Sequence, residues 1–394
     1  MKEKDNYNII NDILDKTQEE IAKMGKINIL VCGKTGSGKS TLINSLFREK
    51  MADTGVGRPV TEHLRKISRE DVPLVLYDTR GLELDEAIQA QVFNEINDLD
   101  NSTKGTEEEL NICYYCINAG SNRIEPIEID LIKSISRKIP VILVLTMSIG
   151  QPAKDLKSYI DNLNLPVVST VNVMAKDYQV SDDYVLPAFG LKDLVGLTLE
   201  SIPEEKRKAF NNAQQADIKR KADEAYSWAK KYVAASFGVG FVPIPFADAS
   251  ILVPMQVTII AHITAIFGIS LSKSSLVSIV AAIGGTGGAT YLGRTIVANI
   301  LKFVPGSSAA TGLISGSTAA LVTSALAMSY IKVLTLVSQM EFESDKNKAN
   351  LIGELLKKEY KLALKKKSDD LVDDDIVPDK EGIFDRVRDI FKKK

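Results

Sequence analysis

The sequence predicts an α/β domain, with a mostly parallel sheet covered by helices on both faces, followed by an all-α domain rich in small residues. From residue 26 to about 202, short apolar runs alternate with stretches of helical periodicity, which is the pattern of strands joined by helical crossovers. From about residue 231 to 338, the composition shifts to Ala, Gly, Ser, Thr, Ile and Val. A chain of 394 residues has room for about two to three such domains.

These changes in pattern divide the chain into five segments. Near the N-terminus, large aliphatic residues recur at helical spacing in a polar stretch, which predicts an amphipathic helix that packs on its own protein rather than on a membrane or a partner. The segments are the N-terminal amphipathic helix (1–25), the α/β domain (26–202), a linker helix (203–230), the apolar helical domain (231–338) and a charged tail ending in an amphipathic helix (339–394).

Within the α/β domain, each apolar run is expected to form a strand. These runs cover residues 27–32, 74–77, 112–117, 141–145 and 167–173. A further strand near residues 64–68 would pair antiparallel beside the second of them. Helices are expected at residues 40–48, 85–99, 126–136, 153–162 and 191–201. In a sheet of this kind, ligands bind at the carboxyl ends of the strands.

The charge balance and the cysteines narrow the class of protein. With 49 basic and 51 acidic residues, the chain has no basic excess that would indicate nucleic acid as a partner. Three cysteines, an odd number, favour a reducing compartment over a disulfide framework. Cys113 and Cys116 form a C-x-x-C, but the apolar run around them indicates a buried strand rather than a redox or zinc site. The N-terminus lacks the apolar core of a secretory signal, so we expect the α/β domain to face the cytoplasm.

A phosphate-binding loop is expected directly after the first strand. The segment from Gly33 to Ser40 reads G-x-x-x-x-G-K-S, and a helical stretch continues from it. Glycines let backbone N–H groups curl around phosphate oxygens, Lys39 adds a positive charge at the β- and γ-phosphates, and the Ser40 hydroxyl can ligate Mg²⁺. The expected nucleotide-binding residues of this loop are Gly33, Lys34, Thr35, Gly36, Ser37, Gly38, Lys39, Ser40 and Thr41.

Two further segments are expected to complete the phosphate and metal site. Asp78 and Gly81 belong to a D-x-x-G at the end of a strand, where the Asp can hold Mg²⁺ through water and the Gly N–H can sense the γ-phosphate. The segment 55–61 is too rich in Gly and Pro for regular structure. Within it, Thr61 is the candidate for the threonine that closes over the metal and the γ-phosphate, with Thr54 as the alternative. The expected catalytic residues are Lys39, Thr61 and Gly81, and the expected metal ligands are Ser40, Thr61 and Asp78.

Together these motifs resemble those of the Era-like, translation-factor class of P-loop GTPases. The resemblance rests on the phosphate loop, Pro59-Val60-Thr61, Tyr77-Asp78-Thr79-Arg80-Gly81 and Met174-Ala175-Lys176, and it covers about the first half of the chain. It implies a Ras-like fold, GTP and GDP as bound nucleotides and Mg²⁺ as cofactor. By position, Ala175 and Lys176 match the base-binding loop, whose backbone N–H meets the guanine oxygen, and Thr146 begins the other base-binding segment.

The sequence departs from this family at two points. Where the guanine-specifying N-K-x-D should stand, residues 146–149 read Thr-Met-Ser-Ile, with no carboxylate for the guanine N–H groups. Leu82 stands where many small GTPases carry a water-orienting Gln. We therefore expect slow hydrolysis, on the order of 10⁻⁴ per second unaided, with stimulation by self-association or by a partner. Arg58 and Arg80 are candidates for a stimulating residue.

The segment after residue 231 indicates association with a membrane. Residues 249–272, 274–293 and 303–331 carry no Asp, Glu, Lys or Arg, and each is about long enough to cross a bilayer. Small residues recur every fourth position, which allows close helix packing; they are Ser308, Gly312, Gly316, Ala320 and Ser324. A soluble helical bundle would show the same residues, and conditional insertion is favoured over full spanning.

Residues 229–338 also resemble a bacterial domain of unknown function that is fused behind Era-like GTPases. Immunity-related and dynamin-like GTPases offer a looser analogy of architecture. The sequence thus predicts a GTP-binding and GTP-hydrolysing switch whose nucleotide state controls a helical domain at the cytoplasmic face of the cell membrane, with a homo-oligomer as a further expectation. Two alternatives remain open, a P-loop ATPase of the same architecture and a structural or pore-forming membrane protein that binds nucleotide only to fold.

Overall fold

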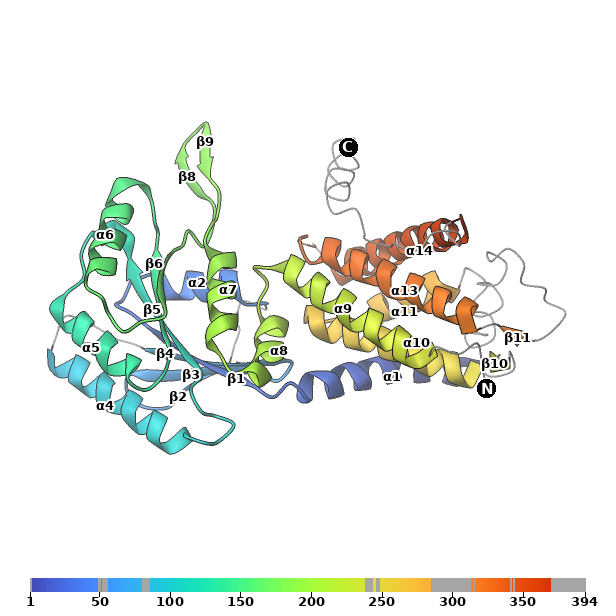
Figure 1. Ribbon diagram of the computed structural model, residues 1–394, viewed down its shortest axis with the longest axis horizontal. Coiled ribbons are helices and arrows are strands. Elements are labelled where there is room, and N and C mark those ends of the chain that lie inside the picture. The colour runs from blue at the N-terminus through green and yellow to red at the C-terminus, as the bar shows by residue number, and fades with distance from the viewer. Residues whose placement is uncertain are drawn as a thin grey trace.

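The computed structural model describes residues 2–48, 51, 56–79, 86–237, 244–245, 249–284, 313–314, 316–340, 342 and 344–369. Figure 1 shows a sheet domain on the left and a helical bundle on the right, joined end to end into an elongated molecule. The N-terminal helix lies in the bundle rather than on the sheet domain, so the first and the last described helices, α1 and α14, belong to the same half of the molecule.

Seven of the described strands in the first half form one sheet, in the order β2-β3-β4-β1-β5-β6-β7. The strands β4, β1, β5, β6 and β7 run parallel, and the hairpin β2–β3–β4 pairs antiparallel at one edge. Their bounds are β1 Ile27–Cys32, β2 Val56–Pro59, β3 Leu64–Arg69, β4 Val72–Thr79, β5 Ile112–Asn118, β6 Val141–Thr146 and β7 Ser169–Asn172. The predicted fold class is confirmed. The expectation that residues 55–61 lack regular structure is wrong, because β2 lies there.

Alternate side chains of the central strands enter two separate cores, one on each face of the sheet. Ile27, Ile29 and Val31 of β1 join one core with α2 and α7, while Leu30 and Cys32 join the other with α4, α5 and α6. This period of two is what a strand buried on both faces requires. The covering helices are α2 Lys39–Leu46, α4 Glu86–Thr103, α5 Pro126–Ser136, α6 Gly150–Asn162 and α7 Leu191–Ser201.

The expected single linker helix over residues 203–230 is two helices in the structure. They are α8 (Glu204–Ala213) and α9 (Ile218–Phe237). Between them Gln214 is fully buried, donates to the carbonyl of Asp217 and accepts from its N–H. These two bonds give the backbone a local alternative to continuing the helix, and they were not readable from charge patterning.

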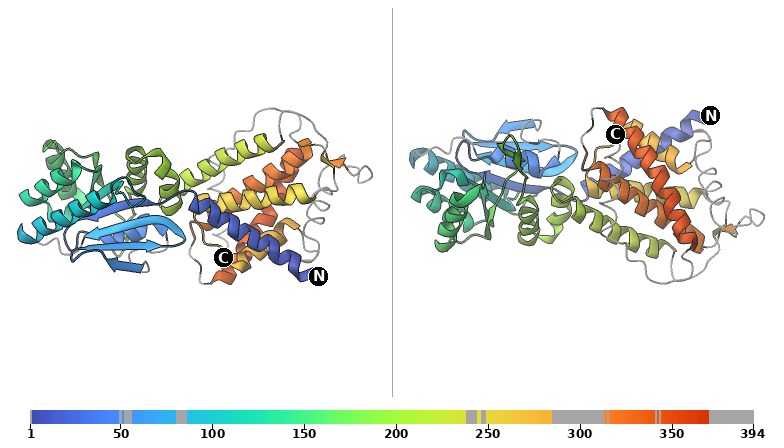
Figure 2. Two further views of the ribbon diagram at one scale, coloured as in Figure 1. Left: turned by 90° about the horizontal axis from the view of Figure 1, so that it is seen from below. Right: turned by 90° about the horizontal axis from the view of Figure 1, so that it is seen from above.

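The second half is a helical bundle with its own apolar core. Figure 2 shows α1 (Lys2–Ala22) lying across α10 (Ala249–Phe267), with α13 (Gly316–Val337) and α14 (Asp345–Asp369) beside them. The helix α11 (Lys273–Gly284) packs on α14 so closely that a Cβ added at Gly353 would lie 3.1 Å from the Cβ of Ser278. Two short strands, β10 (Ile244–Pro245) and β11 (Leu313–Ile314), pair at the far end.

Some features that the sequence predicts for this half lie outside the described residues. Ser308, Gly312 and the terminal amphipathic helix expected after residue 369 lie outside them, whereas Gly316, Ala320 and Ser324 lie on α13. Among the helices that the structure describes, none combines the length and the apolar character needed to cross a bilayer.

Candidate nucleotide-binding site

The loop between β1 and α2 has the backbone geometry that a phosphate cradle requires. Gly33, Gly36 and Gly38 adopt φ values of 139°, 77° and 82°, which residues with a Cβ rarely adopt. A Cβ at Gly33 would lie 2.3 Å from the carbonyl oxygen of Cys116, so the neighbouring strand leaves no space there. The helix α2 begins without a side-chain cap, which leaves its first N–H groups available to an anion.

Two lysines of this loop have different partners. Lys39 Nζ donates to the carbonyl oxygens of Gly33 (2.6 Å) and Lys34 (3.0 Å), so its ammonium lies inside the curve of the loop. Lys34 Nζ instead forms a 2.8 Å ion pair with Glu128 at the start of α5. Glu128 is buried and also accepts from the N–H of Glu125. The Lys34 side chain therefore stabilises the loop from outside.

Thr146 supports the loop from the adjoining strand. Its hydroxyl donates to the carbonyl oxygen of Ser37 at 2.6 Å and lies 3.2 Å from that of Ile117. A Cβ added at Gly38 would approach the Thr146 hydroxyl to 3.2 Å. We expected Thr146 to contact the base, and the structure shows a buried residue that fixes the phosphate loop to the end of β6.

The predicted segments converge on one cavity of about 610 Å³ at the carboxyl ends of the strands. The phosphate loop lines one side, the ends of β4 and β6 line the floor, and the segment after β7 lines the other side. The lining residues are Thr35, Gly36, Ser37, Gly38, Lys39, Ser40, Thr41, Asp78, Thr79, Thr146, Met147, Met174, Ala175, Lys176, Asp177 and Tyr178. The structure therefore brings together the expected phosphate, metal and base segments at the edge where α/β sheets bind ligands.

Ser40 and Asp78 fit a magnesium site. Both line the same cavity, beside the start of α2, and a hydroxyl and a carboxylate are oxygen donors of the kind that Mg²⁺ prefers. The third expected ligand, Thr61, is placed elsewhere. Its hydroxyl donates to the carboxylate of Glu95 on α4 and accepts from the N–H of Leu64 at 3.1 Å, and it does not line the cavity.

The other candidate site residues lie either in β2 or outside the described residues. Arg58 lies in β2. Thr54, Arg80, Gly81 and Leu82 lie outside the described residues.

The three cysteines are free and buried, and burial raises the pKa of the Cys116 thiol to about 12. A thiol held protonated in this way is a core residue and a poor nucleophile or metal ligand.

Sequence reasoning missed a hairpin that lines the base side of the cavity. The strands β8 (Tyr178–Ser181) and β9 (Tyr184–Leu186) project from the sheet domain (Figure 1). Asp177 anchors the base of the hairpin, since its carboxylate accepts from the N–H of Ala188 at 2.8 Å. Alternating apolar residues around Asp182 and Asp183 were the signal that could have predicted it.

Comparisons with known proteins agree with this division of the chain. A family model described as "50S ribosome-binding GTPase" matches residues 28–147, and one described as "Domain of unknown function (DUF697)" matches residues 204–362. Septin-9 of Homo sapiens is 28% identical over 165 residues, which cover 34% of this chain and 28% of that protein. GTPase Era of Streptomyces coelicolor is 28% identical over 118 residues, which cover 29% of this chain and 35% of Era. The chain thus spans well under two thirds of the length of these relatives.

Two solved structures resemble the sheet domain weakly. The septin GTPase domain from Chlamydomonas reinhardtii aligns with 47% of this chain and 96% of its own, at 16% identity and a TM-score of 0.32. A probable GTP-binding protein engB aligns with 45% of this chain and 99% of its own, at 16% identity and a TM-score of 0.32. Likenesses this weak carry no argument about function.

A parallel sheet with a G-x-x-x-x-G-K-S loop after its central strand is the architecture of the P-loop nucleoside triphosphatases. The family model described as "50S ribosome-binding GTPase" matches the same strand and loop, which indicates a GTPase within that class. The sheet domain of this chain thus has the fold and the phosphate loop of this class, its residues 28–147 match a GTPase family model, and a second, helical domain follows it.

Proposed function

We propose that this chain binds and hydrolyses GTP, that its nucleotide state controls its helical domain, and that the helical domain associates with the cytoplasmic face of a membrane. The observation that supports control of the helical domain is a path of contacts that runs from the phosphate-binding helix through α8 to the bundle. Phe47, which follows α2, packs edge-on against Phe210 of α8 with ring centroids 6.0 Å apart, and α8 in turn packs against α10. We also propose, from the motifs, that this chain is related to the Era-like GTPases.

The chain's own residues suit GTP hydrolysis by charge stabilisation and positioning. Lys39 lies where it would stabilise the charge on the transferred phosphate, and the N–H groups at the start of α2 would hold the phosphate oxygens. Ser40 and Asp78 would hold Mg²⁺, which supplies positive charge to those oxygens when it is bound. The base would meet the backbone of Ala175. With Leu at position 82, a second copy of the chain is our proposed source of the group that orients the attacking water.

The membrane part of the proposal rests on the composition of the helical domain. From residue 249 to 331 only Lys273, Arg294 and Lys302 are charged. A segment so poor in charge suits contact with an apolar phase once its packing is opened. The nucleotide would set how readily the bundle opens.

Sedimentation with anionic liposomes tests the proposal. We expect the full chain to pellet differently with a non-hydrolysable GTP analogue than with GDP, and Lys39→Ala to lose that difference while keeping its circular dichroism spectrum. Equal pelleting of the wild type in both nucleotide states would contradict control of the membrane contact by nucleotide. Loss of the folded state in Lys39→Ala would instead favour a membrane protein that binds nucleotide only to fold.

Selectivity for guanine is a separate part of the proposal. Ile149 takes the place of the carboxylate that would accept from the guanine N–H groups, and 36% of its surface is exposed. This residue keeps a P-loop ATPase as the second candidate. Competition of GTP and ATP against a fluorescent nucleotide separates the two, and we expect GTP to compete more strongly because the Ala175 N–H faces an acceptor in guanine and an amino group in adenine.

A further inference from the structure

The two domains meet at a buried polar network centred on Asn212. Asn212 has no exposed surface, and its side-chain amide and its carbonyl oxygen bond other elements. Its side-chain oxygen accepts from Arg48 at 3.0 Å, its side-chain nitrogen donates to the carbonyl of Ala265, and its own carbonyl accepts from Lys221 at 2.9 Å. The residue therefore joins the end of α2 to α9 and to the end of α10.

Arg48 extends this network to the β3–β4 turn. It follows α2 directly, and besides Asn212 it donates to the carbonyl oxygen of Asp71 and lies 3.9 Å from the Asp71 carboxylate. The same carboxylate accepts from the hydroxyl of Ser270, in the loop after α10, at 3.3 Å. A Cβ added at Gly268 would lie 2.3 Å from the Asn212 carbonyl oxygen, so the two backbones are too close here for any side chain at position 268.

Lys221 holds the helical side of the network together. Its side chain is 1% exposed, and it donates to the carbonyl oxygens of Asn212 and Phe267 (2.7 Å). These carbonyls lie at the ends of α8 and α10, where the last turns leave acceptors without helical partners and the helix dipoles are negative. Burial lowers the pKa of Lys221 well below its usual value. The two helix ends are thus fixed to each other through one side chain.

The elements that meet in this network are the ones that reach the nucleotide. The helix α2 begins at Lys39 and Ser40 in the nucleotide cavity and ends next to Arg48, a span of about 12 Å. The strand β4 starts beside Asp71 and ends at Asp78 in the cavity. A shift of either element on nucleotide binding would therefore displace Arg48 or Asp71 relative to α10.

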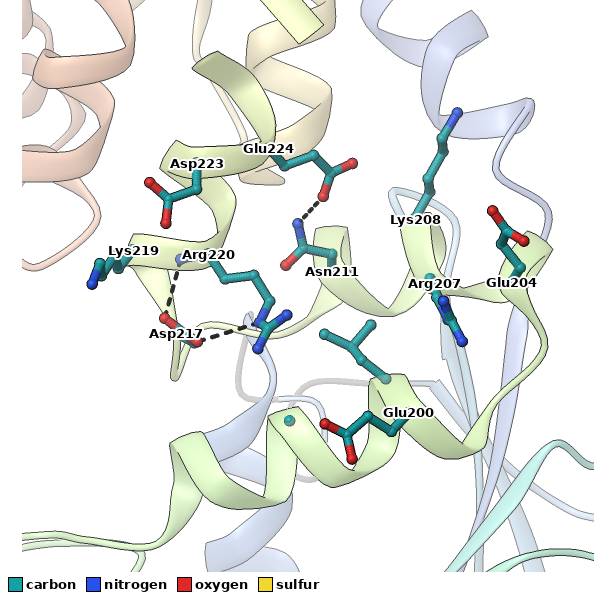
Figure 3. Close-up of a pocket in the computed structure, with 12 residues that line it drawn as sticks. Glu200, Glu204, Arg207, Lys208, Asn211, Asp217, Lys219, Arg220, Asp223 and Glu224 are labelled. Atoms are coloured by element: carbon teal, nitrogen blue, oxygen red, sulfur yellow. Dashed lines mark hydrogen bonds and ion pairs between the residues drawn. The ribbon is translucent and has the colours of Figure 1, made fainter. Parts of the chain in front are cut away.

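The opposite side of the junction has room to move. A cleft of about 730 Å³ lies between α7, α8 and α9. In Figure 3, Asn211 points toward Glu224 across the α8–α9 turn, and Arg220 pairs with Asp217 on the near side of the cleft. Because α7 belongs to the sheet domain and α9 to the bundle, this open side leaves room for the bundle to tilt when the contacts on the Asn212 side change.

We propose that the Arg48–Asn212–Lys221 network transmits the nucleotide state to the α10–α11 loop. This inference rests on the proposed function, and it names the contacts that would carry the coupling. A ligand shifts such an equilibrium only through interactions that differ between the two states. The hydrogen bonds of Arg48 to Asp71 and Asn212 are the interactions that would differ.

Hydrogen exchange of residues 264–276 in the full chain tests the inference. In the wild type we expect exchange in this segment to differ by about fivefold or more between GDP and a non-hydrolysable GTP analogue, the low end of usual allosteric coupling. Asn212→Ala should reduce that difference to less than about twofold, with nucleotide binding retained by calorimetry. Lys332→Ala is the matched control, since it breaks the 2.6 Å pair with Glu359 inside the bundle and should keep the wild-type difference.

The outcomes separate this inference from the proposed function. If the wild type binds GTP but residues 264–276 exchange equally in both states, or if Asn212→Ala keeps the full difference, the network is not the route of coupling. If the wild type does not bind GTP at all, the proposed function fails and the inference fails with it. Should Asn212→Ala not fold, Arg48→Lys carries the same test, because it keeps the charge and loses the fork that bonds Asp71 and Asn212 together.

Discussion

The Thr146 hydroxyl lies 2.6 Å from the carbonyl oxygen of Ser37, and this bond ties the end of β6 to the middle of the phosphate loop. A strand end that was expected to read the base thus fixes the loop that binds the phosphates. Because the bond is buried, we expect its loss to change the conformation of the phosphate loop more than the stability of the whole protein.

Thr146→Val tests this role. The substitution keeps the volume and leaves the Ser37 carbonyl without its donor, which should weaken GTP binding by about 1 kcal/mol, or roughly fivefold in Kd. Calorimetric titration measures the change. Ser148→Ala is the matched control, since its hydroxyl bonds the carbonyl of Leu145 at 2.7 Å and does not touch the loop. Equal affinities for Thr146→Val and the wild type would contradict the supporting role.

Ile149→Asp should change which purines the site distinguishes. In the wild type no carboxylate at residues 146–149 can accept from the guanine 2-amino group, so ITP, which lacks that group, should compete within about threefold of GTP. An Asp at position 149 should favour GTP over ITP by about tenfold or more, because a charged acceptor then meets the amino group. Competition against a fluorescent GTP analogue gives both ratios. A wild type that already rejects ITP a hundredfold would show that another residue reads the amino group.

The rim of the cavity predicts that activity depends on protein concentration. Apolar side chains with 36% to 55% of their surface exposed gather on the hairpin and the β6–α6 loop; they are Met147, Ile149, Tyr178, Val180, Tyr184, Val185 and Phe189. Exposed apolar surface of this kind marks interaction sites. We expect GTPase turnover per molecule to rise with concentration, and Tyr184→Ser with Val185→Ser to abolish the rise.

The control for this prediction is Tyr159→Ser on α6, since Tyr159 is 53% exposed but lies outside both the hairpin and the β6–α6 loop. It should keep the concentration dependence. Turnover per molecule that stays constant from nanomolar to micromolar wild-type protein would argue against stimulation by a second copy.

The stability of the helical bundle should decrease as the pH falls below about 6.5. His262 stacks on Trp228 with ring centroids 3.9 Å apart, and its Nδ1 lies 2.8 Å from Glu20. Burial lowers the pKa of His262 below its ordinary value of 6.5, despite the neighbouring Glu20 carboxylate. Below that value the unfolded chain binds the proton more readily than the folded chain, so the free energy of unfolding should decrease as the pH falls from about 6.5 toward the folded-state pKa.

Urea unfolding of the bundle at several pH values measures this slope. His262→Phe keeps an aromatic ring on Trp228 and removes the titrating group, so it should show a smaller slope between pH 6.5 and 5. Against the effect of burial, Lys23 and His262 both lower the pKa of Glu20. The slope from Glu20, which appears only as the pH falls below its ordinary value of 4.5, should therefore become smaller in His262→Phe and should remain in part because of Lys23. An unchanged slope in His262→Phe would assign the effect to other groups.

The sheet domain was readable from the sequence because its strands and helices have strong periodicity. The expected helices at 126–136 and 191–201 coincide with α5 and α7, and the phosphate loop and the residues at Asp78 and Ala175 lie in the expected cavity. These features depend on local pattern and on motif order along the chain, which a sequence displays directly.

What the sequence did not reveal depends on contacts between distant segments. The buried roles of Thr146, Asn212 and Lys221 arise from partners in other elements, tens to hundreds of residues away. A Thr in a loop carries no sign of whether it faces Mg²⁺ or a carboxylate such as Glu95. The hairpin after Lys176 was missed because its strands are short and the turn between them lacks glycine.

Calorimetric titration of the full chain with GTP in the presence and absence of Mg²⁺, followed by a phosphate-release assay on the same samples, tests the central claim most directly. We expect magnesium-dependent binding, slow phosphate release, and loss of both in Lys39→Ala with the fold retained. If the wild type shows no magnesium-dependent heat with GTP and releases no phosphate above the Lys39→Ala level, the cavity between the phosphate loop and the β8–β9 hairpin is not a GTPase site.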